Sequence, residues 1–530
     1  MSWLQRLSET YDHCTDAIGN KNDRVPLLPI CHTMQNAHIE VTLDGEGNFL
    51  RAKVVEKDDA PTLIPCTESS SSRSGQKPIN HPLADKLQYV AGDFMTFGGV
   101  VTKGFQKNPT EPFENLLKLT TSWNSEYPNP KLDSITKYLK KKCLIRDLID
   151  RGIIPLFEDQ IAPKKWPGER DERPKIYSVL PPTNGPVDSF VRWNVEIEHS
   201  LGSSCSDDLE LRKSWIEYYL RAYRKEELSA YFSAGGGKIT DQSERASVTT
   251  GYSGDNEASS ICLISGRQEA IGRLHNSDLR YASDSAKLLS ANDGSGFTYR
   301  GKFRYGIEGA SISLATSQKA HNALRWLISK QGQSFGDQCI VCWSTTAPEE
   351  ELPNPFASTL ALLFQTADPK EETPKKKKNK TPARVYTAQD FAEKLNQSMR
   401  GYGSAFADND ADKVIIMAID SATPGRMAIR YYRELQGADF LSRIRTWHET
   451  TAWHQYFAKD KQFVGAPSPK DIAQVAYGKK LDTKNKLLSA TVSRLLPCII
   501  DAAPIPRDLV RACVHRATHK SSIPYWEWSK

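Results

Sequence analysis

The spacing of apolar side chains changes along this 530-residue chain, and the change predicts where strands and helices form. Between residues 38 and 55, apolar and polar positions alternate around an Asp-Gly pair, which predicts a hairpin. Residues 131–149, 207–232 and 316–332 repeat apolar side chains at helical spacing instead. The first part of the chain therefore mixes strands and helices.

Two further segments of this first part carry polar side chains that could contact a ligand. Residues 258–280 read as two strands joined by a glycine turn, with Arg267 in the turn and Arg273 and His275 on the second strand. The helix expected over 316–332 has a polar side made of Gln318, His321, Asn322 and Arg325, opposite an apolar side made of Ala320, Leu324, Leu327 and Ile328. That polar side could hold a ligand or simply face solvent.

The apolar run 414–420 predicts a strand, and the residues after it predict a helix that continues to 435. We interpret Thr423 as its cap and Pro424 as its first residue. On such a helix Arg426, Arg430 and Arg433 share one face and suit phosphate oxygens. The alternative is that they pair with acids elsewhere in the fold. From there to residue 530 an apolar stripe over 488–499 predicts an all-α remainder.

These patterns predict an α+β fold, in which a mixed N-terminal and central α/β-type region with antiparallel strands precedes a mostly helical C-terminal region. The segment 368–384 has three prolines, a block of lysines and no large apolar residue, so it cannot bury enough surface to order itself. We therefore expect four parts: an N-terminal α+β domain, a central α+β region, a loop or linker, and the helical region, over residues 1–206, 207–367, 368–384 and 385–530.

Composition narrows the class of protein. Ten scattered cysteines do not form a disulfide framework, and no apolar run is long enough to cross a membrane, so a cytoplasmic protein is expected. The CxxC pair Cys339 and Cys342 lies in an apolar run without further metal ligands, and we interpret it as a buried strand. P-loop, GxSxG and HExxH motifs are missing, and the acidic run 408–412 is incomplete as a calcium loop. We expect neither a metal nor a cofactor.

Net charge is only +6, so positive charge must act locally. The segment 67–82 combines short hydroxyls, positive charge and amide groups, which are the groups that contact phosphates and base edges. We take this segment as a candidate DNA-sensing loop, with a solvated surface loop as the alternative. The candidate residues are Ser71, Ser72, Arg73, Ser74, Gln76, Lys77 and Asn80.

Other cations are candidates for contact with a nucleic-acid backbone, although a solubilising loop or a solvated face explains them equally simply. They are Lys319, Arg325, Lys375, Lys376, Lys377, Lys378, Arg426, Arg430 and Arg433. A different class of function is suggested by Arg443 and His448, whose spacing occurs in some metal-independent ribonucleases of the HEPN type. Such spacing also arises by chance.

Five phrases in order resemble one family along nearly the whole chain, the large subunit of the type I-C CRISPR Cascade complex. They occupy residues 64–93, 262–275, 315–332, 418–435 and 476–510, and include IPCTESSSSRSGQKPINHPLADKLQYVAGD and AIDSATPGRMAIRYYREL. Members usually continue past the segment matching 524–530, so the resemblance suggests a C-terminally shortened member.

The resemblance implies a non-catalytic, prokaryotic, cytoplasmic subunit that reads a protospacer-adjacent motif in duplex DNA, aids R-loop formation and supports the displaced strand. Base pairing with the guide then supplies most of the sequence specificity, as in another RNA-guided effector. The implied partners are crRNA, target double-stranded DNA, the displaced non-target strand, the backbone, crRNA-processing and small subunits of Cascade, and a helicase-nuclease. A HEPN-like ribonuclease and a purely architectural bridging subunit remain alternatives.

Overall fold

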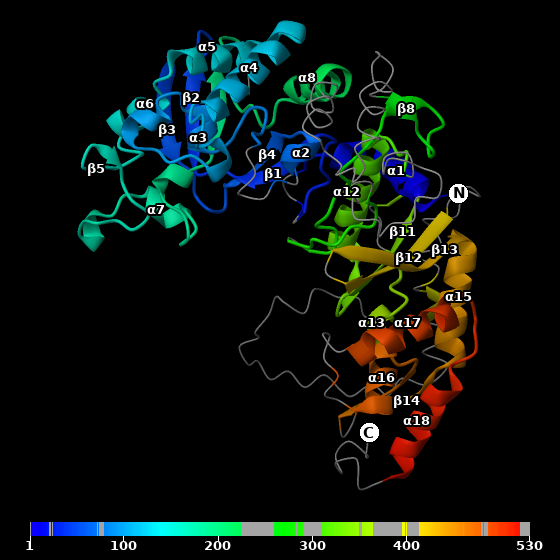
Figure 1. Ribbon diagram of the computed structural model, residues 1–530. Coiled ribbons are helices and arrows are strands. Elements are labelled where there is room, and N and C mark those ends of the chain that lie inside the picture. Colours follow the sequence, from blue (N-terminus) through cyan, green and yellow to red (C-terminus); the bar gives the residue numbers. More distant parts are fainter. Residues whose placement is uncertain are drawn as a thin grey trace, which may run out of the picture.

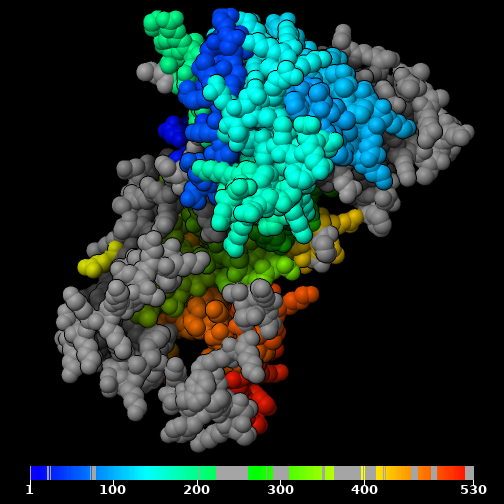
Figure 2. Space-filling model, turned by 90° about the vertical axis from the view of Figure 1, so that its left-hand side faces the viewer, coloured from blue at the N-terminus to red at the C-terminus, as the bar shows by residue number. Residues whose placement is uncertain are grey.

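The computed structural model describes most of the chain, and Figure 1 shows its arrangement. The described residues are 2–20, 23, 25–71, 73, 79–200, 202–223, 259–281, 283–290, 310–348, 352–363, 395–397, 399, 413–423, 425–458, 461–478, 481 and 486–519. An N-terminal lobe lies to one side of a central sheet, and the C-terminal helices lie below that sheet (Figure 1). Figure 2 shows the same succession of layers from another side.

The N-terminal lobe is built on a three-stranded sheet. Its strands are β2 (Ile39–Asp44), β3 (Phe49–Val54) and β7 (Val191–Glu196), in the order β3-β2-β7, with β2 antiparallel to β3 and parallel to β7. The predicted hairpin over 38–55 is confirmed. Asp44 fixes its turn because one carboxylate oxygen accepts from the N–H groups of Glu46 and Asn48, at 2.9 and 2.8 Å, and Gly47 supplies the positive φ of +76°.

Helices enclose this sheet and a core that includes Val41, Leu43, Trp123 and Trp193. They are α3 (Leu87–Val90), α4 (Glu111–Glu126), α5 (Pro130–Lys141), α6 (Leu144–Asp150), α7 (Ile176–Val179) and α8 (Leu209–Tyr218). The single helix predicted over 131–149 is divided into α5 and α6, because Lys142 adopts a left-handed conformation that ends α5. The helix predicted from 207 is present as α8 and continues as a π-helix over Tyr219–Tyr223.

Smaller elements complete this lobe. They are β1 (His32–Asn36) paired with β4 (Pro61–Pro65), β5 (Leu156–Phe157) paired with β6 (Gln160–Ile161), the short helix α2 (Glu68–Ser71), and single turns over Phe94–Phe97, Lys103–Phe105, Arg170–Glu172 and Pro186–Asp188. Another single turn, Thr15–Ala17, lies outside this lobe, because Ala17 packs in the core that contains Trp326 and Trp343. Outside this lobe, the predicted strand, turn and strand over 258–280 are present as β8 (Ser259–Ile261) and β9 (Gln268–Ala270), with Gly266 at φ +68° (Figure 1). Arg273 and His275 therefore follow the second strand, instead of lying on it.

The centre of the molecule is a four-stranded antiparallel sheet. Its strands are β10 (Gln333–Phe335), β11 (Gln338–Ser344), β12 (Lys413–Thr423) and β13 (Arg426–Gln436), in that order. Side chains of β12 alternate between two cores, with Ile415 and Met417 on one face and Val414 and Ile416 on the other. Every residue of β11 is buried, so the interpretation of Cys339 and Cys342 as part of a buried strand is confirmed.

One face of this sheet is covered by α1 (Trp3–His13) and α12 (Leu314–Gln331), which pack against each other (Figure 1). The other face meets α15 (Gly437–Thr450) and α17 (Lys486–Ile500). The same core also receives buried side chains from α13 (Thr359–Leu363), α16 (Pro469–Tyr477) and α18 (Arg507–Thr518). The apolar stripe over 488–499 lies on α17 and is buried, as predicted. The predicted all-α remainder is wrong, because β14 (Trp453–Ala458) and β15 (Lys461–Gly465) form a hairpin.

The helix predicted over 424–435 is also wrong, because residues 426–436 form β13. Thr423 pairs with Arg426, and Gly425 has a φ of +106°. Pro424 itself lies outside the described residues. The pattern was ambiguous because Ile429, Tyr431 and Tyr432 suit a strand as well as a helix, and pairing with the apolar run 414–419 of β12 decides the outcome.

These elements confirm an α+β fold with a largely helical C-terminal region. The fourfold division of the chain stays a prediction, since 368–384 lies outside the described residues. Strands β11 and β12, from either side of that segment, pair with each other over 338–344. The acidic run 408–412 also lies outside the described residues.

Candidate nucleic-acid interface

The candidate DNA-sensing loop, residues 67–82, begins at a short helix whose first turn is closed by reciprocal hydrogen bonds. The backbone N–H of Ser70 donates to Thr67 Oγ1 at 3.0 Å, and the N–H of Thr67 donates to Ser70 Oγ at 2.9 Å. Such reciprocal bonds satisfy donors that a helix start leaves open. The N-terminal stem of the loop is therefore set by its own sequence.

Glu68 fastens this stem to a distant part of the chain. Its side chain is buried, and Oε1 accepts from the backbone N–H groups of Arg273 and Leu274, at 2.6 and 2.8 Å. The N–H of Glu68 donates to the hydroxyl of Tyr219 at 2.7 Å. A buried carboxylate needs donors such as the N–H groups after β9. These residues and Tyr219, at the start of the π-helix after α8, together hold the loop's first residues in place.

Asp85 fastens the other stem. One oxygen accepts from Arg73 Nη1 and from the N–H of His81, at 2.8 and 2.7 Å, while the other accepts from Arg73 Nη2 and the N–H of Lys86. Arg73 also donates to the carbonyl of Ile79 at 2.5 Å, across the base of the loop. The two stems are thus joined where residues 73 and 79 meet.

The environment of Arg73 is that of a structural cation. Its guanidinium lies 5.1 Å from the ring centre of Tyr89 and is 13% exposed, and the carboxyl of Asp85 is fully buried. Burial by itself would lower the pKa of Arg73, but the charge and hydrogen bonds of Asp85 raise the pKa above its ordinary value. The charge of Arg73 is already satisfied by Asp85, whereas sequence reasoning placed it near phosphate.

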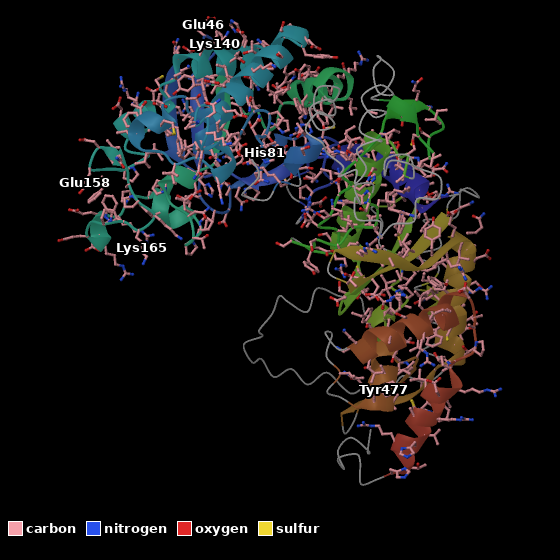
Figure 3. All side chains as sticks on the ribbon, in the orientation of Figure 1. Glu46, His81, Lys140, Glu158, Lys165 and Tyr477 are labelled. Carbon is pink, nitrogen blue, oxygen red and sulfur yellow. The ribbon has the colours of Figure 1, made fainter. Side chains whose placement is uncertain are left out.

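His81 lies on the side of the N-terminal lobe that is turned toward α1 and α12 (Figure 3). Its ring is buried, Nδ1 lies 3.1 Å from Ser70 Oγ, and burial lowers its pKa to about 4. A neutral imidazole can bridge the stems without adding a charge to the interior.

The remaining loop candidates divide between described and undescribed residues. Ser71 is exposed and donates to the carbonyl of Glu68 at 3.0 Å, and Asn80 is half-buried and donates to the carbonyl of His81 at 3.2 Å. Outside the described residues lie Ser72, Ser74, Gln76 and Lys77.

Glu68, Asp85 and His81 were missed by sequence reasoning, which looked for groups that touch a ligand. An acid between Thr67 and Ser70, and a histidine four residues before Asp85, are the only local signals of their roles. Burial of a carboxylate among backbone donors depends on segments far along the chain, and composition does not reveal it.

The cationic candidates on β13 are partly neutralised. Arg430 Nε lies 3.5 Å from the carboxylate of Asp420, and Arg433 Nε lies 2.9 Å from that of Asp501. Both side chains are about half exposed, and Arg426 is exposed at the start of the strand. Arg430 and Arg433 therefore pair with acids elsewhere in the fold, which was the alternative that the sequence left open. Residues 375–378 lie outside the described part of the chain.

The polar side of α12 is buried, whereas sequence reasoning favoured exposure. Gln318 accepts from the N–H of Cys31 at 2.6 Å, and Asn322 donates to the carbonyl of Leu28 at 3.0 Å. The helix therefore uses this side to hold residues 28–31. Lys319 pairs with Asp12 at 2.7 Å, while Arg325 makes no hydrogen bond or ion pair with any described residue.

The geometry of α15 argues against an active site at Arg443 and His448. His448 is fully buried, with Nδ1 2.7 Å from the hydroxyl of Thr359, and burial lowers its pKa to about 4. Arg443 is exposed and lies five residues earlier, so the two side chains diverge around the helix. A catalytic histidine must reach its substrate, and this one faces the core.

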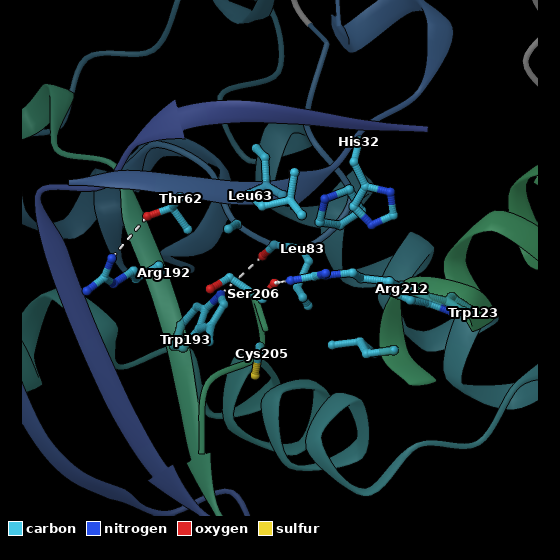
Figure 4. Close-up of a pocket in the computed structure, with 14 residues that line it drawn as sticks. His32, Thr62, Leu63, Leu83, Trp123, Arg192, Trp193, Cys205, Ser206 and Arg212 are labelled. Carbon is cyan, nitrogen blue, oxygen red and sulfur yellow. Dashed lines mark hydrogen bonds between the residues drawn. The ribbon is translucent and has the colours of Figure 1, made fainter. Parts of the chain in front are cut away.

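A cavity inside the N-terminal lobe, drawn in Figure 4, offers no reactive constellation. It has a volume of about 20 Å³ and apolar walls that include Leu83, Trp123 and Trp193. Its polar groups are already engaged, since Arg192 donates to Thr62 Oγ1 at 3.1 Å and Trp193 Nε1 donates to the carbonyl of Leu83 at 3.1 Å (Figure 4). A space of this size holds about one water molecule.

Among the residues that the structure describes, no cluster of three or more histidine, cysteine or acidic side chains could hold a metal ion. No described helix has the length and apolar character needed to cross a membrane.

Comparison with known proteins places the chain in a class and then in a family. The model of a family of CRISPR-associated proteins matches residues 7–529. The chain belongs to this family, which is named Cas_Csd1. Membership makes it a CRISPR-associated protein and a component of the Cascade type, with partners in that complex. A search of curated proteins finds no match.

Proposed function

We propose that this chain is the large, non-catalytic subunit of a type I-C Cascade complex in the prokaryotic cytoplasm. In this proposal it binds duplex DNA at the protospacer-adjacent motif through the 67–82 loop and aids R-loop formation. It also supports the displaced strand and helps to recruit a helicase-nuclease. Its partners are crRNA, target DNA, and the backbone, crRNA-processing and small subunits.

The observation that carries the proposal is the pair of anchored stems. Glu68 and Asp85 are buried acids that fix the two ends of a segment composed of serine, glycine, arginine, glutamine and lysine. Fixed ends reduce the entropy lost when the residues between them bind a ligand. Membership in a CRISPR-associated family over residues 7–529 makes nucleic acid the appropriate ligand class.

Roles within the loop follow from side-chain chemistry. Gln76 and Asn80 offer donors and acceptors to base edges, and Lys77 offers charge to phosphate. The serines 71, 72 and 74 offer short hydroxyls to phosphate oxygens. Arg73 becomes a positioning residue, because its guanidinium already pairs with Asp85. A second set of cations contacts the phosphates of the nucleic-acid backbone in this proposal. These cations are Lys319, Arg325, Arg426, Arg430, Arg433 and residues 375–378.

The test is duplex binding by the assembled complex against a library of flanking sequences. The double variant Gln76→Ala with Asn80→Ala is expected to weaken binding of motif-bearing duplexes by about tenfold or more, and to leave binding of motif-free duplexes nearly unchanged. Loss of one good base contact costs about 1–3 kcal/mol of discrimination.

A matched control replaces Lys375–Lys378 with glutamine. This variant should weaken both kinds of duplex alike and reduce the dependence of affinity on salt. If the loop variant loses the same affinity for motif-bearing and motif-free duplexes, the loop contacts only phosphates and does not read the motif. Equal binding by complexes with and without the subunit would favour a purely architectural role.

A further inference from the structure

A small polar pocket lies where α12, the residues after β9 and the N-terminal stem of the loop meet. Its volume is about 60 Å³. Its polar walls come from three separate parts of the chain and include Ser71, Asn276, Asp278, Gln318, Asn322 and Arg325. Because Ser71 ends α2, the pocket adjoins the candidate DNA-sensing loop directly.

The distinguishing group in this pocket is the guanidinium of Arg325. It is half-buried, and it makes no hydrogen bond or ion pair with any residue in the described part of the chain. Burial lowers the pKa of Arg325, and the nearby charge of Asp278 offsets this only in part. A desolvated cation without a partner is costly, and an anion that enters the pocket would remove that cost.

The surrounding amides are held in fixed orientations. Gln318 Oε1 accepts from the N–H of Cys31 at 2.6 Å, which leaves its Nε2 as a donor. Asn276 Nδ2 donates to Asn322 Oδ1 at 3.2 Å, and Asn322 in turn donates to the carbonyl of Leu28. Walls that are already hydrogen-bonded need no rearrangement when a ligand binds.

Asp278 sets a limit on the strength of binding. Its carboxylate accepts from Ser277 Oγ at 3.2 Å and lines the same pocket as Arg325. No ion pair joins Asp278 to Arg325 within the described residues, so the guanidinium keeps its directional donors for a ligand. The negative charge of Asp278 repels an anion in the pocket and lowers its affinity. A lower affinity suits a contact from which the strand must dissociate.

We propose that this pocket binds one phosphate group of the nucleic-acid strand that the 67–82 loop engages, with Arg325 as the principal donor. The planar fork of arginine matches two phosphate oxygens, and the pocket has room for one such group. This inference rests on the proposed function, and it adds a defined phosphate site beside the loop stem.

The test uses the full chain and a fluorescent single strand of about ten nucleotides, titrated at several salt concentrations. Arg325→Gln should weaken binding about tenfold and reduce the slope of log affinity against log salt by about 0.7, the value for one phosphate on a single strand. Arg325→Lys should recover part of the affinity, since it keeps the charge without the fork. Lys330→Gln, on the same helix with its ammonium over Trp326, should change little.

A second variant is expected to increase the affinity for the strand. An increase in affinity cannot be explained by misfolding. Asp278→Asn removes the opposing charge and should strengthen binding severalfold. Inorganic phosphate at millimolar concentration should raise the thermal unfolding temperature of the unmodified chain, but not that of Arg325→Gln. Equal effects of Arg325→Gln and Lys330→Gln, or weaker binding by Asp278→Asn, would overturn the proposal.

The two proposals fail separately. If Gln76→Ala with Asn80→Ala abolishes motif discrimination while Arg325→Gln leaves strand affinity unchanged, the phosphate pocket and the backbone role of Arg325 are wrong, and motif reading by the loop stands. If Arg325→Gln alone weakens binding, the pocket stands and motif reading by the loop is wrong.

Discussion

The guanidinium of Arg73 and the carboxylate of Asp85 form a two-pronged ion pair whose acid is fully buried. An unpaired charge inside a protein costs far more than an exposed one, because water no longer solvates it. The same carboxylate also accepts from the backbone N–H groups of His81 and Lys86. At the scale of residues, this acid determines where the loop's stems meet.

Asp85→Asn is therefore expected to lower the free energy of unfolding by about 3 kcal/mol, since it leaves Arg73 buried without a counter-charge. Urea denaturation of the full chain measures this. Glu196→Gln is the matched control, because Glu196 pairs with Arg51 on the surface, where such pairs contribute at most about 1 kcal/mol. Similar losses from both variants would show that the buried pair has no special weight.

At the scale of elements, the β2–β3 hairpin is specified by its own turn and then constrained by a helix. Gly47 has φ +76°, and a Cβ there would lie 2.6 Å from the carbonyl oxygen of Ser134 on α5. Gly152 also has a positive φ, +67°, but a Cβ there would meet no atom within 4 Å. Substitution of either glycine strains the backbone, but only substitution of Gly47 also creates a steric clash. Comparing the two variants therefore distinguishes the two effects.

Gly47→Ala should destabilise the chain clearly more than Gly152→Ala. Both variants meet the cost of about 1 kcal/mol for a left-handed residue, but only Gly47→Ala also pushes the hairpin away from α5. Thermal unfolding followed by calorimetry measures the difference. Equal shifts for the two variants would mean that α5 moves freely away from the turn.

At the scale of the whole molecule, buried imidazoles link stability to pH. Burial lowers the pKa of four histidines to about 4, in three separate parts of the fold; they are His32, His81, His321 and His448. In the unfolded chain a histidine has a pKa near 6.5. Between these values the unfolded state binds more protons than the folded state.

Stability should thus be fully present above about pH 6.5 and fall as the pH drops toward 4, by up to about 1.4 kcal/mol per pH unit for each histidine. Urea denaturation at several pH values measures the slope. His448→Gln should reduce the slope by the share of one histidine, and His199→Gln, at an exposed position, should leave it unchanged. A flat profile from pH 6.5 to 4.5 would contradict the buried, neutral state of these rings.

Local sequence was sufficient where neighbouring residues decide the structure. Asp44 and Gly47 encode the hairpin turn, and the apolar runs encode β11 and β12. In each case the determining contacts lie within a few residues, so spacing and residue type predict them. The family resemblance also lies in ordered local phrases, and the family match over 7–529 confirms its coarser part, a CRISPR-associated protein.

Tertiary structure alone decided the outcome where one sequence pattern is compatible with two structures, such as a strand or a helix, or a buried or an exposed helix side. Residues 426–436 became a strand because β12 offered an apolar edge, and the polar side of α12 was buried because Leu28 and Cys31 supplied its partners. Arg73 pairs with Asp85, whereas Arg325 makes no hydrogen bond or ion pair with any described residue and has only the nearby charge of Asp278. Burial and pairing are set by contacts between distant segments, and these determine which charges of this chain are free to meet a ligand.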